Sequence, residues 1–322
     1  MIKLTAKNKE LQEMFAAMRQ IADEIRLNIT QDGLKSAMVN PANTSILYME
    51  LPRAIFNGFY VDESRTIGIN LSEWYSAIQF NSPKDLIEFE LEITKHFSGA
   101  QGTGQPYESI YGVFKDLDGF EDAMAILDPA SLRKEPKPIS TPKEATIKIS
   151  VERLKKILKK AAMKQKRSSR RSRYAADYYI KFNVENGTFT TSHKADIRKG
   201  KSKTIATGET EITGKAHACY STFELISIIN TIKDKTVILE FADDYPLTIH
   251  FKILQHGTGR YLLAPRVEEE PRRRRDPEQT TPQTVPQTTP QDPAQIIPPE
   301  VPQTIPQDPA QTVPQDKTEE TK

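Results

Sequence analysis

The chain has 322 residues, with 45 Lys and Arg against 43 Asp and Glu and a formal net charge of +2. Its single cysteine, Cys219, excludes a disulfide framework and a cysteine-based zinc site within one chain, and we expect neither a metal nor a cofactor. The first residues hold no apolar signal core, and no apolar run approaches the ~20 residues of a membrane span, so the sequence predicts an intracellular protein that does not enter a membrane.

The first half of the chain mixes strand and helix patterns. Alternating apolar and polar residues predict strands at 1–5, 24–30, 44–51 and 86–93, with Asp32–Gly33 as a hairpin turn. Apolar residues at helical spacing predict helices at 8–19 and 71–80. Residues 96–109 are rich in glycine and predict an enlarged loop.

The same order of patterns restarts near residue 145. Helices are predicted at 150–163 and 221–232, strands at 178–184, 236–242 and 247–253, and a hairpin turn at Asn186–Gly187. The proline-rich, charged segment 128–144 between the halves predicts an exposed connector. The sequence therefore predicts an α+β fold with two similar domains, 1–127 and 145–270, each with two helices over a largely antiparallel sheet.

The last segment, 271–322, is dominated by Pro, Gln and Thr and has no aromatic residue. The block PQTTPQDPAQ at 286–295 returns almost unchanged as PQTIPQDPAQ at 302–311. Such a composition buries too little apolar surface to offset the entropy of ordering, so we expect a disordered tail. It is either an extended docking arm or a segment that keeps the protein in solution.

The third predicted helix has one entirely cationic face. Arg153, Lys155, Lys156, Lys159 and Lys160 lie opposite its apolar stripe. Like charges four residues apart cost a helix about 0.3 kcal/mol per pair. A face retained at that cost indicates an anionic partner, most simply phosphate groups, whereas a solvated face usually mixes Glu with Lys. Residues 164–173 lack apolar periodicity and predict a mobile basic loop, which extends the phosphate contacts or acts as a nuclear-import-like address.

Catalysis is not supported by the sequence. The stretch from Gly208 to Lys215 resembles a phosphate-binding loop, but it has one residue too many and Ala216 follows the lysine where Ser or Thr is needed. Asp243 and Asp244 could be imagined as metal ligands, but a turn before a strand explains them. We therefore expect a binding protein that is not an enzyme.

Four segments, in order, resemble one known family. DDYPLTIHFKILQHGTGRYLLAPRVEEE at 243–270 closely resembles the C-terminus of sliding clamps of the proliferating cell nuclear antigen family. ITQDGLKSAMVNPANTSILYMEL at 29–51, TIGINLSEWYSAI at 66–78 and AILDPASLRKEP at 125–136 are similar to further segments of that family, the last in its archaeal form. The resemblance spans about 1–270 and leaves the tail uncovered.

The resemblance implies a function. Subunits of the family close into a ring, usually a trimer, through which duplex DNA passes without sequence-specific contacts. The ring is opened by a separate loader ATPase, and it tethers DNA polymerase and other clamp-binding proteins. The expected DNA contacts are Lys9 and Arg19 of the first helix with Arg153, Lys155, Lys156, Lys159, Lys160, Lys164, Arg167, Arg170 and Arg171.

The resemblance also implies two protein interfaces. A pocket for partner peptides would be lined by Val39, Thr44, Ile46, Leu132, Tyr245, Pro246, Leu262, Ala264 and Pro265. Subunits would join an edge strand at about 120–127 to an edge strand at about 188–194 of the next copy.

The chain also departs from the family pattern. The polar side of the second helix carries no Lys or Arg, and Asn40 stands where the family usually has Asp. These departures indicate a divergent clamp from an archaeon or a virus. The alternatives are a subunit of a checkpoint-type heterotrimeric clamp and a structural DNA-coating protein that forms no ring.

Overall fold

The computed structural model describes residues 1–97, 106–116, 118–169, 179–193, 204–206 and 211–266. Residues 1–270 belong to one compact unit, and the tail predicted at 271–322 lies outside the described residues. The expected division of the unit into domains 1–127 and 145–270 stays a prediction. These two ranges are the first and the second half of the unit.

The described residues of the first half form nine strands and two α-helices. In chain order they are β1 (Ile2–Lys7), α1 (Asn8–Arg19), β2 (Glu24–Thr30), β3 (Gly33–Val39), β4 (Ser45–Pro52), β5 (Gly58–Val61), β6 (Arg65–Asn70), α2 (Leu71–Ile78), β7 (Leu86–Phe97), β8 (Pro106–Lys115) and β9 (Glu121–Ala125). Single 3-10 turns follow β4 and β9, at Arg53–Ile55 and Pro129–Ser131.

The described elements of the second half follow the same succession. They are β10 (Ala145–Ser150), α3 (Val151–Ser169), β11 (Tyr179–Glu185), β12 (Thr188–His193), β13 (Thr204–Ala206), β14 (Glu211–Gly214), β15 (Ala216–Ser221), α4 (Thr222–Thr231), β16 (Thr236–Phe241), β17 (Leu247–Ile253) and β18 (Gly257–Leu263). The repetition predicted from the sequence is therefore present in the order of the elements.

The sheets show the same repetition. Each half makes a five-stranded set, β5-β1-β7-β8-β9 or β14-β10-β16-β17-β18, and a four-stranded set, β6-β2-β3-β4 or β15-β11-β12-β13. Every pairing between these strands is antiparallel. The halves join where β18 pairs with β4, with Leu262 opposite Ile46, so that one set from each half forms a single nine-stranded sheet.

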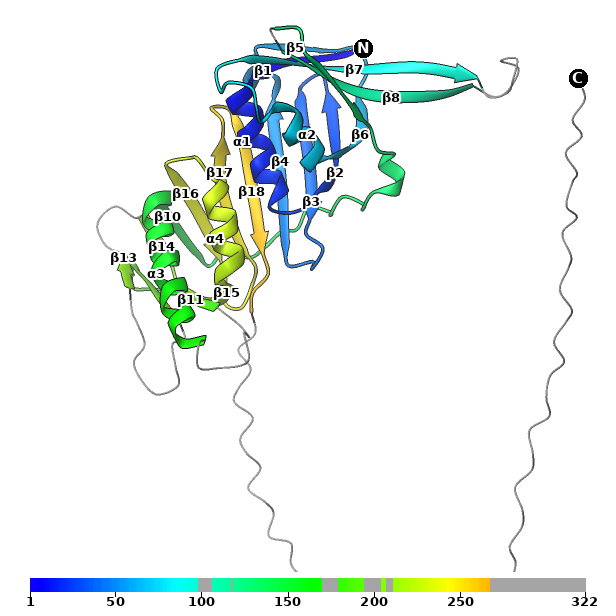
Figure 1. Cartoon of the computed structure of the whole chain (residues 1–322). Coiled ribbons are helices and arrows are strands. Elements are labelled where there is room, and N and C mark those ends of the chain that lie inside the picture. The colour runs from blue at the N-terminus through cyan, green and yellow to red at the C-terminus, as the bar shows by residue number, and fades with distance from the viewer. Residues whose placement is uncertain (98–105, 117, 170–178, 194–203, 207–210, 267–322) are drawn as a thin grey trace, which may run out of the picture. The chain divides into compact units, whose positions relative to one another are not determined.

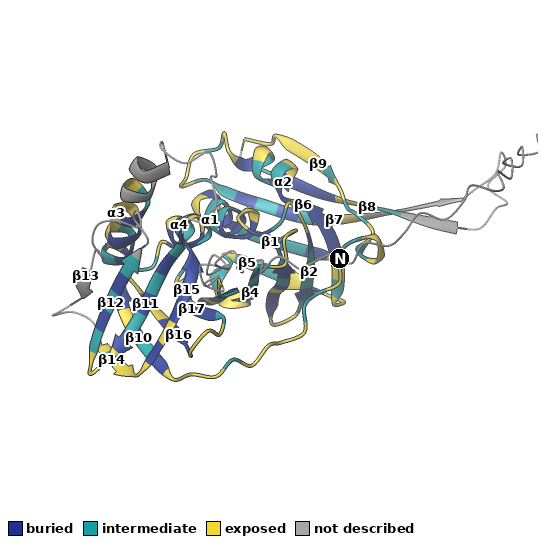
Figure 2. Cartoon of the chain, turned by 90° about the horizontal axis from the view of Figure 1, so that it is seen from below, coloured by how far each residue is buried: buried dark blue, intermediate teal, exposed yellow. Residues whose placement is uncertain are grey.

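The four helices lie on the same side of the sheets, in the row α3, α4, α1, α2 (Figure 1). Their apolar stripes face the sheets, and Leu11, Phe15, Leu154 and Leu225 are buried. The buried residues lie between helices and strands (Figure 2). Polar caps begin two of the helices, because the side chains of Asn70 and Ser221 accept hydrogen bonds from backbone N–H groups of the first turn.

The hairpin turn predicted at Asn186–Gly187 is confirmed, and three other predictions need correction. The turn predicted at Asp32–Gly33 lies one residue earlier, at 31–32, because Gly33 already pairs with Thr30. Asn186 and Gly187 have φ of 50° and 66°, the left-handed pair that a tight hairpin requires. Helix α3 continues to Ser169, so the first part of the predicted loop 164–173 is helical. Lys, Gln and Arg are good helix formers, so a helix can continue through these residues without an apolar stripe. The ends of the predicted loop 96–109 belong to β7 and β8.

Candidate nucleic-acid and partner interfaces

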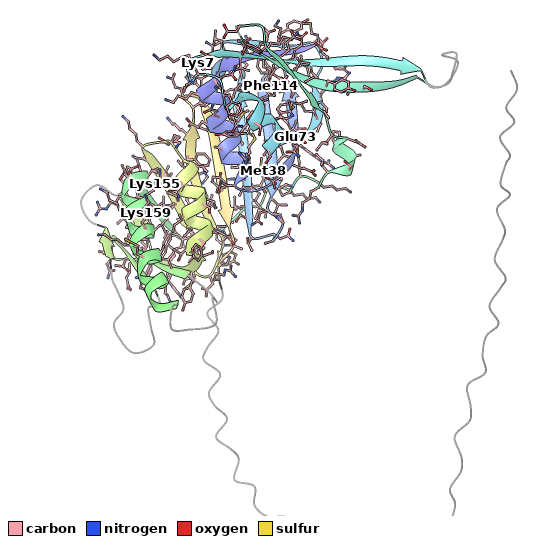
Figure 3. All side chains as sticks on the ribbon, viewed as in Figure 1. Lys7, Met38, Glu73, Phe114, Lys155 and Lys159 are labelled. Atoms are coloured by element: carbon pink, nitrogen blue, oxygen red, sulfur yellow. The ribbon has the colours of Figure 1, made fainter. Side chains whose placement is uncertain are left out.

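The cationic residues of α3 differ in what their side chains contact. The side chain of Lys155 is only 18% exposed, and its ammonium lies 3.5 Å from the carbonyl oxygen of Ile232 and 3.9 Å from the carboxylate of Glu152. It is therefore directed toward α4. Lys156, Lys159 and Lys160 are exposed and have no ion pair among the described residues. Figure 3 labels Lys155 and Lys159 along this helix.

Other predicted DNA contacts lie on or beyond the same helix. Arg153 is half-buried in the first turn of α3. Lys164 and Arg167 belong to the last turns of α3, where the backbone is described, and Arg170 and Arg171 lie outside the described residues. The structure therefore brings Lys156, Lys159 and Lys160 to one exposed surface.

The two cations predicted on α1 lie at opposite ends of that helix. Lys9 lines a surface hollow together with Lys233, Lys235 and Lys252, from the segment after α4 and from β17. The sequence does not reveal this meeting, because three separate segments supply the four lysines. The guanidinium of Arg19 instead lies 4.8 Å from the ring centroid of Tyr75 on α2.

Most residues of the predicted partner pocket gather on the sheet face away from the helices. Val39, Ile46 and Leu262 are direct partners across β3, β4 and β18, so their side chains share one face. The next row along this face is Ala37, Tyr48 and Arg260, and the guanidinium of Arg260 lies 4.5 Å from the ring centroid of Tyr48.

The end of this face is formed by turns. The backbone N–H of Ala264 donates to the carbonyl of Thr44 at 2.8 Å, which places Pro265 beside the turn before β4. Tyr245, 51% exposed, precedes Pro246 at the start of β17, and its carbonyl accepts a hydrogen bond from the Tyr220 hydroxyl at 2.9 Å. Leu262 is only 3% exposed and can form the floor of a partner site but offers little surface to a partner.

The connector crosses this same face. Its carbonyl at Leu132 accepts from Arg26 of β2, and its carbonyl at Lys137 accepts from the Tyr48 hydroxyl, both at 2.8 Å. Further on, the hydroxyls of Thr141 and Thr248 lie 3.1 Å apart. Leu132 itself packs on Gly68 of β6, with β2 and β3 between it and β4. The structure thus separates Leu132 from the other predicted pocket residues.

Sequence reasoning missed three residues that hold this arrangement. Arg133 donates to the carbonyl of Asn40 at 2.8 Å and to the side chain of Asn43, which ties the connector to the β3–β4 turn. Tyr48 and Arg260 form the stacked pair described above. Period-two alternation marks Tyr48 as a strand residue but does not show which chain segment crosses it.

The unpaired sheet edges correct one prediction. Strand β9 forms an edge, as expected for 120–127. In the second half, β12 is not the edge, because β13 pairs with it, with Thr190 opposite Ile205. The predicted edge at 188–194 is therefore replaced by β13. A strand of three described residues is too short for its alternation to be recognised in a sequence.

The suspected catalytic motifs have structural roles. Lys215 is followed directly by strand β15, whereas a phosphate-binding loop must open a helix. The carboxylate of Asp243 accepts from the backbone N–H of His217 at 2.6 Å and lies 2.9 Å from its imidazole. Within the described part of the chain, no helix is long and apolar enough to cross a membrane.

The chain has a clamp fold of the α+β class. Its two halves follow the same order of elements, and they are joined edge to edge beneath the row of four described helices. No family model matches the chain. It is 26% identical over 277 residues to a DNA polymerase sliding clamp of Methanosarcina barkeri and 23% identical over 276 residues to that of Archaeoglobus fulgidus. Each match covers 84% of this chain and all of the relative.

Solved structures agree in fold. The A. fulgidus proliferating cell nuclear antigen bound to the C-terminal region of FEN-1 superposes with a TM-score of 0.70, at 23% identity, covering 84% of this chain and all of that one. The Thermococcus kodakaraensis antigen gives 0.66 at 17% identity, covering 83% of this chain and all of that one. The chain is thus similar in sequence to archaeal DNA polymerase sliding clamps over most of its length, and it shares their fold. The sliding clamps that it resembles are not enzymes, in agreement with the expectation from the sequence.

Proposed function

We propose that the chain is a processivity clamp whose copies close head to tail into a homotrimeric ring around duplex DNA. The ring tethers DNA polymerase and other replication and repair proteins, and a separate ATPase loads it. Each subunit supplies the two halves 1–127 and 145–270 as domains. Because its ligand is genomic or viral DNA, the clamp acts inside a cell, as expected from the sequence.

The observation that carries this proposal is the pairing of β4 with β18. Strand β9 is the last strand of the first five-stranded set, and β18 has the same place in the second. Strand β13 is the last strand of the second four-stranded set, and β4 has the same place in the first. Joining β9 of one copy to β13 of the next therefore repeats a junction that the chain already makes internally. The interface is heterologous, and such interfaces generate rings when the rotation closes.

The row of helices supports the same arrangement. It ends with α3 on one side and α2 on the other. Repetition of the subunit would make a continuous lining of helices, on which Lys156, Lys159 and the lysines around Lys9 supply sequence-independent phosphate contacts. A ring holds DNA topologically, so these contacts need not be strong.

The outer sheet face under the connector is the proposed site for partner peptides. The A. fulgidus relative binds the C-terminal region of FEN-1. In this chain the exposed Tyr245 with Val39, Ile46 and Pro246 would receive the apolar anchors of such a peptide. Substitution of Tyr245 by Ala should abolish binding of a FEN-1 C-terminal peptide and leave the molar mass of the protein unchanged.

The test of the proposal combines mass and DNA retention. Light scattering should give about 110 kDa, three times 36.5 kDa. After loading, the protein should stay on nicked circular DNA and slide off when the circle is linearised. Lys156→Ala with Lys159→Ala should reduce retention and leave the mass unchanged. A monomer that binds linear and circular DNA equally would replace the proposal with a DNA-coating protein. A trimer obtained only with a homologous subunit would replace it with a heterotrimeric clamp.

A further inference from the structure

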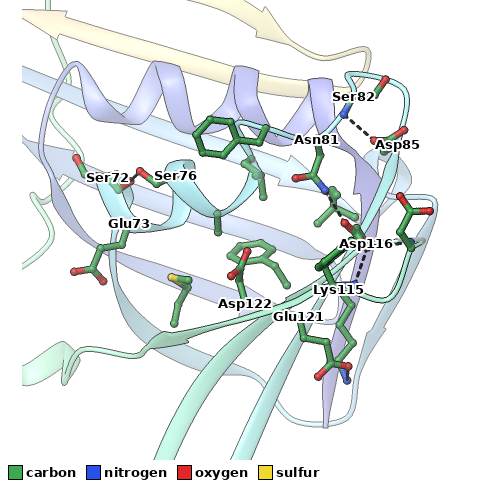
Figure 4. A pocket seen from close by; sticks show the side chains of 18 residues that line it. Ser72, Glu73, Ser76, Asn81, Ser82, Asp85, Lys115, Asp116, Glu121 and Asp122 are labelled. Carbon is green, nitrogen blue, oxygen red and sulfur yellow. Dashed lines mark hydrogen bonds and ion pairs between the residues drawn. The ribbon is translucent and has the colours of Figure 1, made fainter.

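A groove lies between α2 and β9, next to the unpaired edge of the first half (Figure 4). Its acidic lining comprises Glu73, Asp85, Asp116, Asp118, Glu121 and Asp122, against Lys115 as the cation. Phe80 and Phe120 also line it, and their side chains are 88% and 74% exposed. An apolar surface with an acidic rim fits a partner that is apolar and basic.

Not all of these acids are available to a partner. Asp116 accepts hydrogen bonds from the backbone N–H groups of Asp118 and Phe120, at 2.9 Å each, and from Asn81. Glu121 lies 3.3 Å from the ammonium of Lys115. The carboxylate of Asp122, by contrast, has no partner among the described residues.

The junction inside the chain shows what occupies the equivalent place. Where β18 meets β4, α1 of the first half packs against α4 of the second. The hydroxyl of Tyr261 on β18 donates to the carbonyl of Ala17 on α1 at 2.8 Å, and Ala17 is 2% exposed. A helix of one half therefore covers the last strand of the other half, on the side that faces the helices.

The strand register identifies the residue that corresponds to Tyr261. In the second half, direct partners across four strands are Ile147, Leu239, Ile249 and Tyr261. In the first half, the same ladder is Leu4, Phe89, Phe114 and Asp122. Each ladder begins at the third residue of the first strand of its half. Asp122 thus occupies the position of Tyr261.

The helices correspond in the same way. Ala17 is the tenth residue of α1, and Lys160 is the tenth residue of α3. The contact between Tyr261 and Ala17 inside the chain therefore corresponds to a contact between Asp122 and Lys160 of two different copies.

We propose that the acidic groove receives the basic helix α3 of a second copy, with Lys160 opposite Asp122. This inference rests on the proposed head-to-tail ring and names the pair that selects its interface. It also accounts for α2, which carries Glu73 and no Lys or Arg where a helix facing only DNA would be basic. The cations of α3 then have three roles: Lys155 meets α4, Lys160 meets the neighbouring copy, and Lys156 and Lys159 face the DNA.

A charge-reversal cycle tests the pair. Asp122→Lys and Lys160→Glu, made singly, each place like charges opposite one another, and each should raise the dissociation constant of the ring at least about tenfold. The double variant restores opposite charges at every interface of the ring and should return the constant to within about threefold of the unaltered chain. Light scattering over a dilution series measures all three, and circular dichroism verifies that each variant is folded.

The matched control is Lys215→Glu, which reverses an exposed lysine between β14 and β15 without touching either surface. It should leave the ring unchanged. If the unaltered chain forms rings and the rings of Asp122→Lys and of Lys160→Glu are as stable as these, the proposed pair is wrong and the proposed function is unaffected. Two weakened single variants that the double variant does not rescue would also overturn it. An unaltered chain that never forms rings would overturn the proposed function itself.

Discussion

The internal junction and the open groove are built on the same backbone plan, but their side chains differ in kind. Inside the chain, the last strand presents Tyr261 to Ala17, and both residues are buried. At the open edge, the corresponding positions hold Asp122 and Lys160, both exposed. The first pair lies within one chain, whose halves are joined covalently by the connector, whereas in the proposed ring the second pair would be exposed to water whenever the ring is open.

This difference follows from what each junction must tolerate. A buried, uncharged pair such as Tyr261 and Ala17 is stabilised by removal of its apolar surface from water, and that surface would be aggregation-prone if it were exposed. A charged pair is soluble when separated, and its attraction guides two correct surfaces together and disfavours wrong ones.

The largest effect is expected at Tyr261. Its ring is fully buried and stacks on Phe251 with centroids 5.2 Å apart. Tyr261→Ala should therefore lower the free energy of unfolding by about 3–5 kcal/mol, as large-to-small changes of buried aromatic residues do. Asp122→Ala, at the equivalent position, should change it by less than about 0.5 kcal/mol. Denaturant unfolding measures both free energies. Similar losses of stability in the two variants would mean that the two junctions do not differ in the way described above.

A second, smaller effect is expected at Phe120. Its side chain is 74% exposed in the isolated chain, but it would be covered when α3 of a neighbour fills the groove. Phe120→Ala should weaken ring formation by about 1–2 kcal/mol per interface and leave unfolding of the isolated chain unchanged. Light scattering and denaturant unfolding separate the two effects. A loss of folding stability without loss of assembly would place Phe120 outside the interface.

The fold could be predicted from the sequence largely because its signals are local. The stripe Leu11, Phe15 and Met18 determines α1, and Asn186–Gly187 determines a hairpin turn. The end of α3 could not be predicted, because residues 164–169 are helical without an apolar stripe. The edge strand β13 is also too short to have a period.

The site could be predicted only where one segment carries it. The cationic face of α3 is visible because its lysines are close in sequence. Lys9 and Lys252 meet through tertiary packing, and the groove combines α2 with β8, β9 and the turn between them, so neither has a sequence signature. The equivalence of Asp122 with Tyr261 is visible only in the strand register, because the residues have no chemical similarity.

Salt should distinguish the two junctions by a moderate amount. Raising the ionic strength from about 0.1 to 1 M shortens the screening length from ~10 to ~3 Å, which weakens attraction between exposed charges far more than apolar contact. The dissociation constant of the ring should rise about tenfold over this range, whereas the free energy of unfolding of the isolated chain should not fall. A ring that tightens with salt would show that the apolar residues of the groove dominate its assembly.

The smallest effect concerns Glu13, which lies on α1 at the internal junction. Burial raises the pKa of its carboxyl above 4.5, although a hydrogen bond from the backbone of Leu254 and the charge of Lys233 act in the opposite direction. The folded chain therefore binds this proton more tightly than the unfolded chain, so the ionised carboxylate lowers stability at neutral pH, and the loss disappears as the pH falls below the pKa. Glu13→Gln should raise the free energy of unfolding at pH 7 by less than about 1 kcal/mol and should make no difference near pH 4. Thermal unfolding at both pH values measures this, with the exposed Glu24→Gln as control. A variant that is less stable at pH 7 would mean that Glu13 stabilises the junction through Lys233, and that the internal junction depends on a pair of opposite charges, as is proposed for the open one.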